Sequence, residues 1–166
     1  MLTSLKIENF KAWKTTGEIR LAPLTVIFGA NSAGKSSLGH LLLALKQTVL
    51  SADRKRPLHL GDENSLIELG TFAECIHNHD TERPLRFSLG WKLHNRQDVS
   101  DPLTKTKFTG DALKLDVSMI ADENKQAKIN RLSYELSNKQ STVLAIEYRL
   151  DQKNKWELRS EEYNIN

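Results

Sequence analysis

Residues 29–36 read Gly29-Ala30-Asn31-Ser32-Ala33-Gly34-Lys35-Ser36 and match the pattern G-x-x-x-x-G-K-[ST]. The glycines at both ends let the backbone turn tightly and approach an anion without a Cβ in the way. Successive backbone N–H groups of such a turn point inward and form an anion-binding nest. A helix that begins at Lys35 adds its unpaired N–H groups and the positive end of its dipole. This stretch therefore predicts a phosphate-binding loop and the binding of a nucleoside triphosphate.

The segments on both sides of the phosphate-binding loop have the patterns that the motif requires. Leu24-Thr25-Val26-Ile27-Phe28 is a continuous apolar run, which predicts a strand buried on both faces. From Lys35 to about Leu50 the apolar residues recur at helical spacing, which predicts an amphipathic helix. Strand, loop and helix in this order predict an α/β fold of the P-loop NTPase class.

Each polar side chain of the loop has a predicted role. Lys35 would reach the β- and γ-phosphates and is the predicted catalytic residue. The Ser36 hydroxyl would ligate a Mg²⁺ ion that bridges these phosphates. Ser37 would bond the α-phosphate. The predicted nucleotide contacts from the loop are Gly29, Asn31, Ser32, Ala33, Gly34, Lys35, Ser36 and Ser37.

The rest of the chain reads mostly as strands. Short candidates precede the antiparallel part, at Leu5–Phe10, Glu18–Leu21 and Leu66–Leu69. Alternating segments separated by polar turns then predict an antiparallel meander with one wet face. These segments are Leu85–Leu93, Leu113–Ile120, Ile129–Leu136, Val143–Leu150 and Trp156–Ile165, with a predicted loop over His94–Asp111. We therefore expect one domain with an α/β part over residues 1–50, a connector over 51–84 and a β-subdomain over 85–166.

Composition bounds the function class. The chain has 166 residues, with 24 Lys plus Arg against 21 Asp plus Glu, so its net charge of +3 permits an anionic partner but does not demand one. The single cysteine, Cys75, excludes an internal disulfide and a cysteine-based metal site. No apolar run is long enough for a membrane span, and the N-terminus does not read as a signal peptide. We expect a soluble cytoplasmic protein with no membrane partner.

Two motifs resemble a known family. With Asn31 and Ser37, the loop resembles the G-x-N-x-x-G-K-S-S form of SMC/RecF-like ABC ATPase heads. The opening Leu5-Lys6-Ile7-Glu8-Asn9-Phe10-Lys11 resembles the I-x-N-F-[RK] start of the same group. The segments 69–72 and 76–80 resemble the branch found in OLD-like and Septu-type anti-phage systems. The later strands resemble the antiparallel β-subdomain of ABC-type heads by architecture alone.

The resemblance implies ATP and Mg²⁺ as ligands and an ATP-sandwich dimer, or a higher oligomer, of heads. It also implies coupling to a nuclease-like or other nucleic-acid-acting effector in antiviral defence or in a process like DNA repair, with nucleic acid as a further candidate partner. By motif position, Asn9 and Lys11 would lie near the α-phosphate or the base. Trp13 would stack on adenine; the alternative is an ordinary core or surface aromatic. For Lys11 the alternative is a charge that only contacts solvent.

A complete head of this kind also needs a serine–glycine signature, a Walker B strand that ends in Asp-Glu, and a histidine switch. The segment 136–140 matches L-S-G-G-Q only superficially, because Asn138 and Lys139 replace the glycines, so it predicts a turn. The segment 143–147 matches four apolar residues before an acid, but Tyr148 takes the place of the second carboxylate, so it predicts a strand.

The catalytic carboxylates are therefore absent from the sequence, since Asp62-Glu63 has no apolar strand before it. Either the chain is the N-terminal part of a longer ATPase, or it is a split protein that another chain completes. We favour the first explanation, because a sheet of so few strands would have exposed edges without the remaining α/β core.

Three weaker features have ordinary readings beside functional ones. His77, His79 and Asp80 resemble a metal cluster but read better as a polar loop near the nucleotide. Arg54-Lys55-Arg56 could touch nucleic acid phosphates, although a charge run in a connector is usually solvated. Cys75 reads as a small buried residue, since no base is placed to activate it.

Three functions remain open from the sequence. The first is a motor or switch ATPase head that dimerises on ATP and is reset by hydrolysis. The second is a regulatory or scaffold module that binds the nucleotide and never hydrolyses it. The third is a small-molecule kinase, which is disfavoured because strands follow where a lid helix with arginines should stand.

Overall fold

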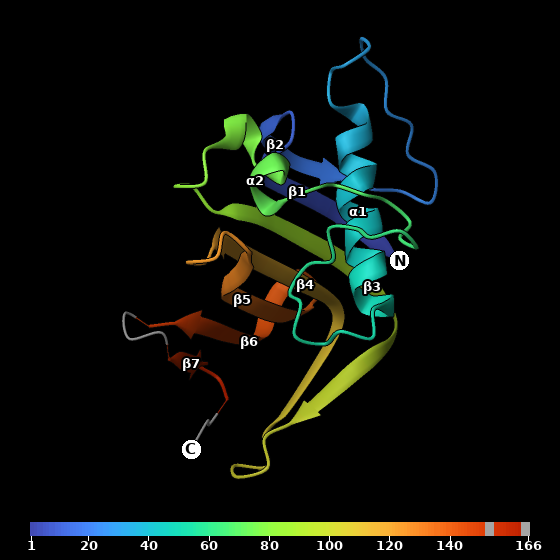
Figure 1. Ribbon diagram of the computed structural model, residues 1–166. Coiled ribbons are helices and arrows are strands. Elements are labelled where there is room, and N and C mark those ends of the chain that lie inside the picture. Colours follow the sequence, from blue (N-terminus) through green and yellow to red (C-terminus); the bar gives the residue numbers. More distant parts are fainter. Residues whose placement is uncertain (152–154, 164–166) are drawn as a thin grey trace.

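The computed structural model describes residues 1–151 and 155–163. This part of the chain forms one seven-stranded sheet with a long helix on one face (Figure 1). The strands are β1 (Leu2–Phe10), β2 (Trp13–Arg20), β3 (Leu85–Ser100), β4 (Lys107–Ala121), β5 (Ala127–Asn138), β6 (Ser141–Leu150) and β7 (Trp156–Arg159). The helical segments are α1 (Lys35–Leu50), α2 (Phe72–Cys75) and the 3-10 helix η1 (His77–His79).

The sheet is antiparallel throughout, in the order β2-β1-β3-β4-β5-β6-β7. Strands β3 to β7 follow one another in sequence, so the predicted meander is confirmed. Strand β1 pairs with β3, although the phosphate-binding loop, α1 and the connector lie between them in the chain. The β1–β2 hairpin therefore joins the meander in one continuous sheet.

The core lies between helix α1 and one face of the sheet. Leu38, Leu41 and Ala44 recur at helical spacing and are 0–5% exposed. They belong to one cluster with the inward residues of β1, β3 and β4, which include Leu5, Ile7, Leu85, Phe87, Val117 and Met119. Alternate residues of a strand point to opposite faces, so the residues between these apolar ones form a second, polar face.

The connector is held onto α1 by Gln47, which is 5% exposed. Its amide nitrogen donates to the carbonyls of His59, at 2.6 Å, and Ile67, at 3.1 Å. Its amide oxygen accepts from the backbone N–H of Ile67 at 3.1 Å. Since these bonds satisfy backbone groups that would otherwise be buried alone, the predicted strand Leu66–Leu69 is wrong and an irregular segment takes its place.

The prediction for α1 is confirmed, because the helix runs from Lys35 to Leu50. The predicted strand Leu24–Phe28 is wrong: the segment has no regular structure, and Leu24 and Phe28 are 82% and 87% exposed. A strand exists only when it is paired, and no described strand lies beside this run to accept its backbone bonds. Of the expected α/β unit, the described residues therefore show the loop and the helix, which lie on an antiparallel sheet.

Two strand boundaries also differ from the prediction. The predicted loop His94–Asp111 is mostly strand, since β3 continues to Ser100 and β4 begins at Lys107. These residues are polar and largely exposed, so they lack the apolar alternation that marks a strand in sequence. They form the long β3–β4 hairpin that projects beyond the core in Figure 1. The predicted strand Trp156–Ile165 is confirmed only over Trp156–Arg159, and its last two positions lie outside the described residues.

No helix among the described residues combines the length and apolar character that crossing a membrane requires.

The core argument predicts the effect of truncating one helix side chain. Leu41→Ala removes a side chain with 0% exposure, so it should lower the free energy of unfolding by about 2–5 kcal/mol. Leu43→Ala, on the outward side of the same helix at 38% exposure, should cost less than about 1 kcal/mol. Urea unfolding followed by circular dichroism measures both, and equal losses would contradict the packing of α1.

Candidate functional site

The phosphate-binding loop connects the exposed run 24–28 to the start of α1. Its backbone has positive φ angles at Gly29 (155°), Ser32 (62°) and Gly34 (84°). The N–H of Ala33 donates to the carbonyl of Ala30, and that of Ser37 donates to Gly34. Among the described residues, the other N–H groups from Asn31 to Ser36 donate to no protein acceptor. The loop therefore presents unused amide donors at a helix N-terminus, which is the arrangement that binds phosphates.

Lys35 lies over this loop. Its ammonium donates to the carbonyls of Gly29, at 2.8 Å, and Ala30, at 2.6 Å. The charge thus sits beside the loop amides and within reach of any anion that they bind. The Ser36 side chain is exposed and makes no hydrogen bond to the described residues, so its hydroxyl is open to a ligand. The predicted contacts Gly29 to Ser36 are brought together on this one turn, whereas Ser37 lies inside α1 and is only 9% exposed, so its predicted bond to the α-phosphate stays a prediction.

Trp13 fixes the far end of the loop. Its indole N–H donates to the carbonyl of Gly34 at 2.9 Å. A Cβ on Gly34 would lie 2.7 Å from the Ala12 Cβ and 3.0 Å from the Trp13 Nε1, so only glycine allows this approach. Trp13 therefore packs at the helix N-terminus beside the loop, and the structure gives it a contact that sequence reasoning missed. The sequence does show a tryptophan two residues after the N-F-K stretch, but its position does not identify Gly34 as the hydrogen-bond partner.

Asn9 and Lys11 lie at the β1–β2 turn, both with positive φ angles. The amide nitrogen of Asn9 donates to the carbonyls of Arg83, at 2.8 Å, and Asp80, at 3.3 Å. The ammonium of Lys11 donates to the carbonyl of Leu69 at 3.2 Å. Both side chains therefore tie the turn to the segment 69–83, and among the described residues neither hydrogen-bonds to the loop. Their predicted contact with the nucleotide stays a prediction.

The histidines of η1 bond to backbone carbonyls rather than to each other. His77 Nδ1 lies 2.9 Å from the carbonyl oxygen of Lys11, and His79 Nδ1 lies 3.0 Å from that of Ala73. Asp80 pairs with Arg83 at 3.2 Å. Within residues 1–151 and 155–163, no group of three or more His, Cys, Asp or Glu side chains is placed to hold a metal ion. This segment therefore serves as a support for the β1–β2 turn.

Cys75 is fully buried, and burial raises the pKa of its thiol to about 11. The thiol accordingly stays protonated at neutral pH, and it is not a nucleophile. Arg54, Lys55 and Arg56 are exposed in the connector, where Arg56 pairs with Asp53 at 3.6 Å.

The segments that superficially match the missing motifs are parts of the sheet. Residues 138–141 form the tight turn between β5 and β6, with positive φ angles at Lys139 and Gln140. Glu147 lies within β6, where both Arg131 Nε, at 2.8 Å, and Arg131 Nη2, at 2.7 Å, contact it. No described Asp or Glu side chain makes a hydrogen bond or ion pair with residues 29–36. The strand prediction for 143–147 is confirmed, and the turn prediction for 136–140 is confirmed only at its end, because β5 continues to Asn138.

The model of a family described as the AAA ATPase domain matches residues 1–166. No curated protein matches this chain.

The loop geometry predicts the effect of adding one methyl group. Gly34→Ala forces an L-residue to a φ of 84° and a Cβ against Ala12, a strain of about 1–3 kcal/mol. ATP affinity should fall by about tenfold or more, because each 1.4 kcal/mol corresponds to about a factor of ten. Titration with a fluorescent ATP analogue measures this.

Gly39→Ala is the matched control, since a Cβ at this exposed helix position meets no atom within 4 Å. It should leave nucleotide affinity unchanged and raise stability by about 0.5–1 kcal/mol. Gly34→Ala binding as tightly as the control would show that the Trp13–Gly34 contact does not shape the loop.

Proposed function

Because the chain belongs to the AAA ATPase domain family, we propose that it binds ATP and Mg²⁺ in the phosphate-binding loop and is the nucleotide-binding part of an ATPase head. The observation that supports this proposal most strongly is the loop itself. Unused amide donors, the positive end of α1 and the Lys35 ammonium meet on one turn. Each of these groups favours negative charge, and together they match a chain of phosphates.

The residues present fit both ligands. The unused amides and Lys35 would hold the phosphates, and the free Ser36 hydroxyl would contribute one oxygen ligand to Mg²⁺. Bound Mg²⁺ supplies charge neutralisation on the phosphate oxygens. For Lys35 to reach a phosphate, its ammonium must exchange the carbonyls of Gly29 and Ala30 for phosphate oxygens. That exchange replaces two neutral acceptors by a charged one, which favours binding.

Hydrolysis needs acidic residues that the described site does not contain. We propose that the exposed run Leu24–Phe28 pairs with a strand that brings these carboxylates to the loop. The run supports this, because it is apolar, exposed and has backbone groups without strand partners. In this proposal the chain is the N-terminal part of a longer ATPase, and the pairing strand belongs to its remaining α/β core.

Several finer features rest on the resemblance to SMC/RecF-like heads. We propose that ATP is sandwiched between two heads in a dimer or higher oligomer. Hydrolysis would reset the dimer and be coupled to a nuclease-like effector or another nucleic-acid-acting partner, in a defence system of the OLD-like or Septu-type branch. Asn9 and Lys11 would support the loop from the β1–β2 turn.

A second candidate function is a nucleotide-binding scaffold that does not hydrolyse ATP. The observation that favours it is that no described acidic side chain forms a hydrogen bond or ion pair with the loop. Steady-state phosphate release by the whole protein separates the two. Turnover that requires Mg²⁺ supports the ATPase head, and ATP binding without turnover supports the scaffold.

The proposed site predicts that Lys35→Ala abolishes binding at micromolar ATP, because it removes the ammonium that lies on the loop. Isothermal titration calorimetry on the whole protein measures this. Lys46→Ala, an exposed lysine of the same helix, removes the same charge and should leave the affinity unchanged. If Lys35→Ala and Lys46→Ala bind ATP equally well, residues 29–36 are not the nucleotide site.

A further inference from the structure

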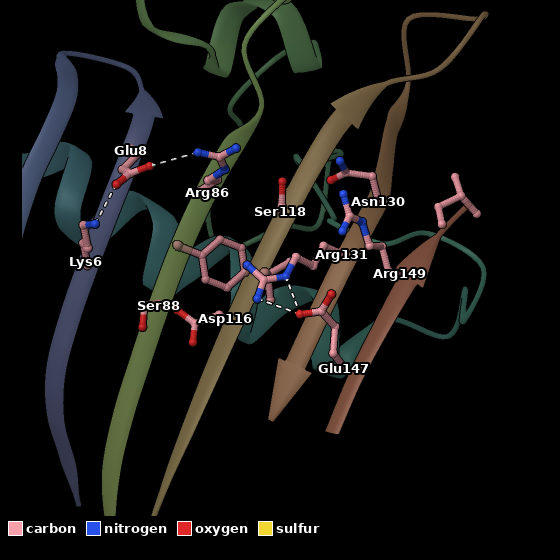
Figure 2. A pocket seen from close by; sticks show the side chains of 13 residues that line it. Lys6, Glu8, Arg86, Ser88, Asp116, Ser118, Asn130, Arg131, Glu147 and Arg149 are labelled. Atoms are coloured by element: carbon pink, nitrogen blue, oxygen red, sulfur yellow. Dashed lines mark hydrogen bonds and ion pairs between the residues drawn. The ribbon is translucent and has the colours of Figure 1, made fainter. Parts of the chain in front are cut away.

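The face of the sheet that points away from α1 contains a cavity of about 660 Å³. It is lined by side chains from β1, β3, β4, β5 and β6. Figure 2 shows these side chains on one side of the strands, with the helix behind the sheet. The phosphate-binding loop takes no part in lining the cavity, so this is a separate site.

The strand register explains how the cavity is built. Two rows of polar residues cross the sheet, each formed by residues that face one another on neighbouring strands. One row is Lys6, Ser88, Asp116, Ser133, Glu147 and Arg159, and the other is Glu8, Arg86, Ser118, Arg131, Arg149 and Glu157. Short serines occupy the middle strands and long charged residues stand around them, so the serines form a floor.

The floor contains unused hydrogen-bonding groups. Ser88 and Ser118, which line the cavity, are only 9% and 6% exposed, and their hydroxyls bond to no described residue. The pairing of β4 with β5 shifts register after Ser118, which leaves Asn130 without a cross-strand partner. The side-chain oxygen of Asn130 is buried and has no hydrogen-bond partner among the described residues. An amide turned by 180° would present its NH₂ here instead. A buried polar atom without a partner is uncommon, so the Asn130 oxygen marks this floor as suited to a polar ligand.

The charges around the floor leave positive charge in excess. Each carboxylate of the cavity is already paired: Glu8 with Lys6 at 2.7 Å, Asp116 with Lys114 at 3.2 Å, and Glu147 with Arg131 at 2.7 Å. Arg86 has only a longer contact, at 3.7 Å, with Glu8. Arg149 is exposed and has no ion-pair partner in the described part of the chain. Among the described residues, Arg149 is therefore a cavity cation without an ion pair, and Arg86 is held only by this longer one. Both are arginines, which suit phosphate oxygens.

The spacing and lining narrow the class of ligand. Arg86 on β3 and Arg149 on β6 are three strand spacings apart, or about 14 Å at roughly 4.8 Å per strand. A single phosphate cannot span this length, whereas a chain of phosphates can. Phe87 is the one aromatic residue among the described lining residues, and it is 4% exposed in the core cluster, so no ring is offered for a base to stack on.

We propose that this polar face binds the phosphodiester backbone of a nucleic acid, with Arg86 and Arg149 contacting two phosphates of one chain and the serine floor donating hydrogen bonds. Binding of this kind reads the backbone and not the base sequence. It requires no ATP in the loop, because the two sites lie on different faces of the sheet.

The test compares two double variants of the whole protein by fluorescence anisotropy, using a labelled 20-nucleotide single strand and a 20-base-pair duplex. Arg86→Ala/Arg149→Ala should weaken binding of at least one probe by about tenfold and lower the slope of log Kd against log salt by about 2. Arg54→Ala/Lys55→Ala removes the same two charges from the connector and should leave binding unchanged. Both arginines of the first variant are exposed, and circular dichroism checks that each variant folds.

Further variants distinguish this proposal from the proposed nucleotide site. Lys35→Ala without ATP should bind the probes as the unaltered protein does, which keeps a failure here distinct from a failure of the nucleotide site. Ser118→Ala should weaken binding by about twofold to tenfold through the lost hydrogen bond. No binding of either probe, an equal loss in the two double variants, or tighter binding of an acidic peptide of equal charge than of the oligonucleotides would each overturn the proposal.

Discussion

The packing of helix α1 on the apolar face of the sheet is the contact on which the remaining structure depends. Leu38, Leu41 and Ala44 bury one stripe of the helix against β1, β3 and β4. Because the helix cannot turn about its axis without exposing that stripe, its N-terminus is fixed in position. The phosphate-binding loop ends at this N-terminus, and the Trp13–Gly34 bond attaches it to the β1–β2 hairpin. The anion-binding geometry is thus a consequence of hydrophobic burial elsewhere.

The run Leu24–Phe28 shows the opposite situation. Its composition is that of a strand in the middle of a parallel sheet, yet its side chains are exposed and its backbone is unpaired. Apolar residues in this pattern gain free energy only when other strands and helices cover them. The run leads directly into the loop, so any strand that pairs with it would end beside the phosphates. This is the physical basis for proposing that the acidic half of the site comes with the remaining α/β core.

The two faces of the sheet have different chemistry because alternate residues of each strand point in opposite directions. Leu5, Ile7, Phe87 and Val117 form the core, whereas Lys6, Glu8, Arg86 and Ser118, each next to one of them in sequence, form the polar face. The same strands can therefore position a nucleotide loop on one side and an array of arginines and serines on the other. A ligand on the polar face would meet groups held by the same backbone that positions the loop.

The sequence by itself determined the elements whose signal is local. The glycines and lysine of residues 29–36 define a loop, helical spacing defines Lys35–Leu50, and alternation defines most strands of the meander, because each pattern is written in neighbouring residues. Tertiary structure alone decided which elements pair and which polar groups meet. Leu24–Phe28 lacks the partner that a strand requires, Leu66–Leu69 is held by Gln47 instead of by a strand, and the β3–β4 hairpin continues without apolar alternation. The Trp13–Gly34 bond joins residues that are distant in sequence, and so does the polar row that contains Arg86, Arg131 and Arg149. Only the folded chain could reveal them.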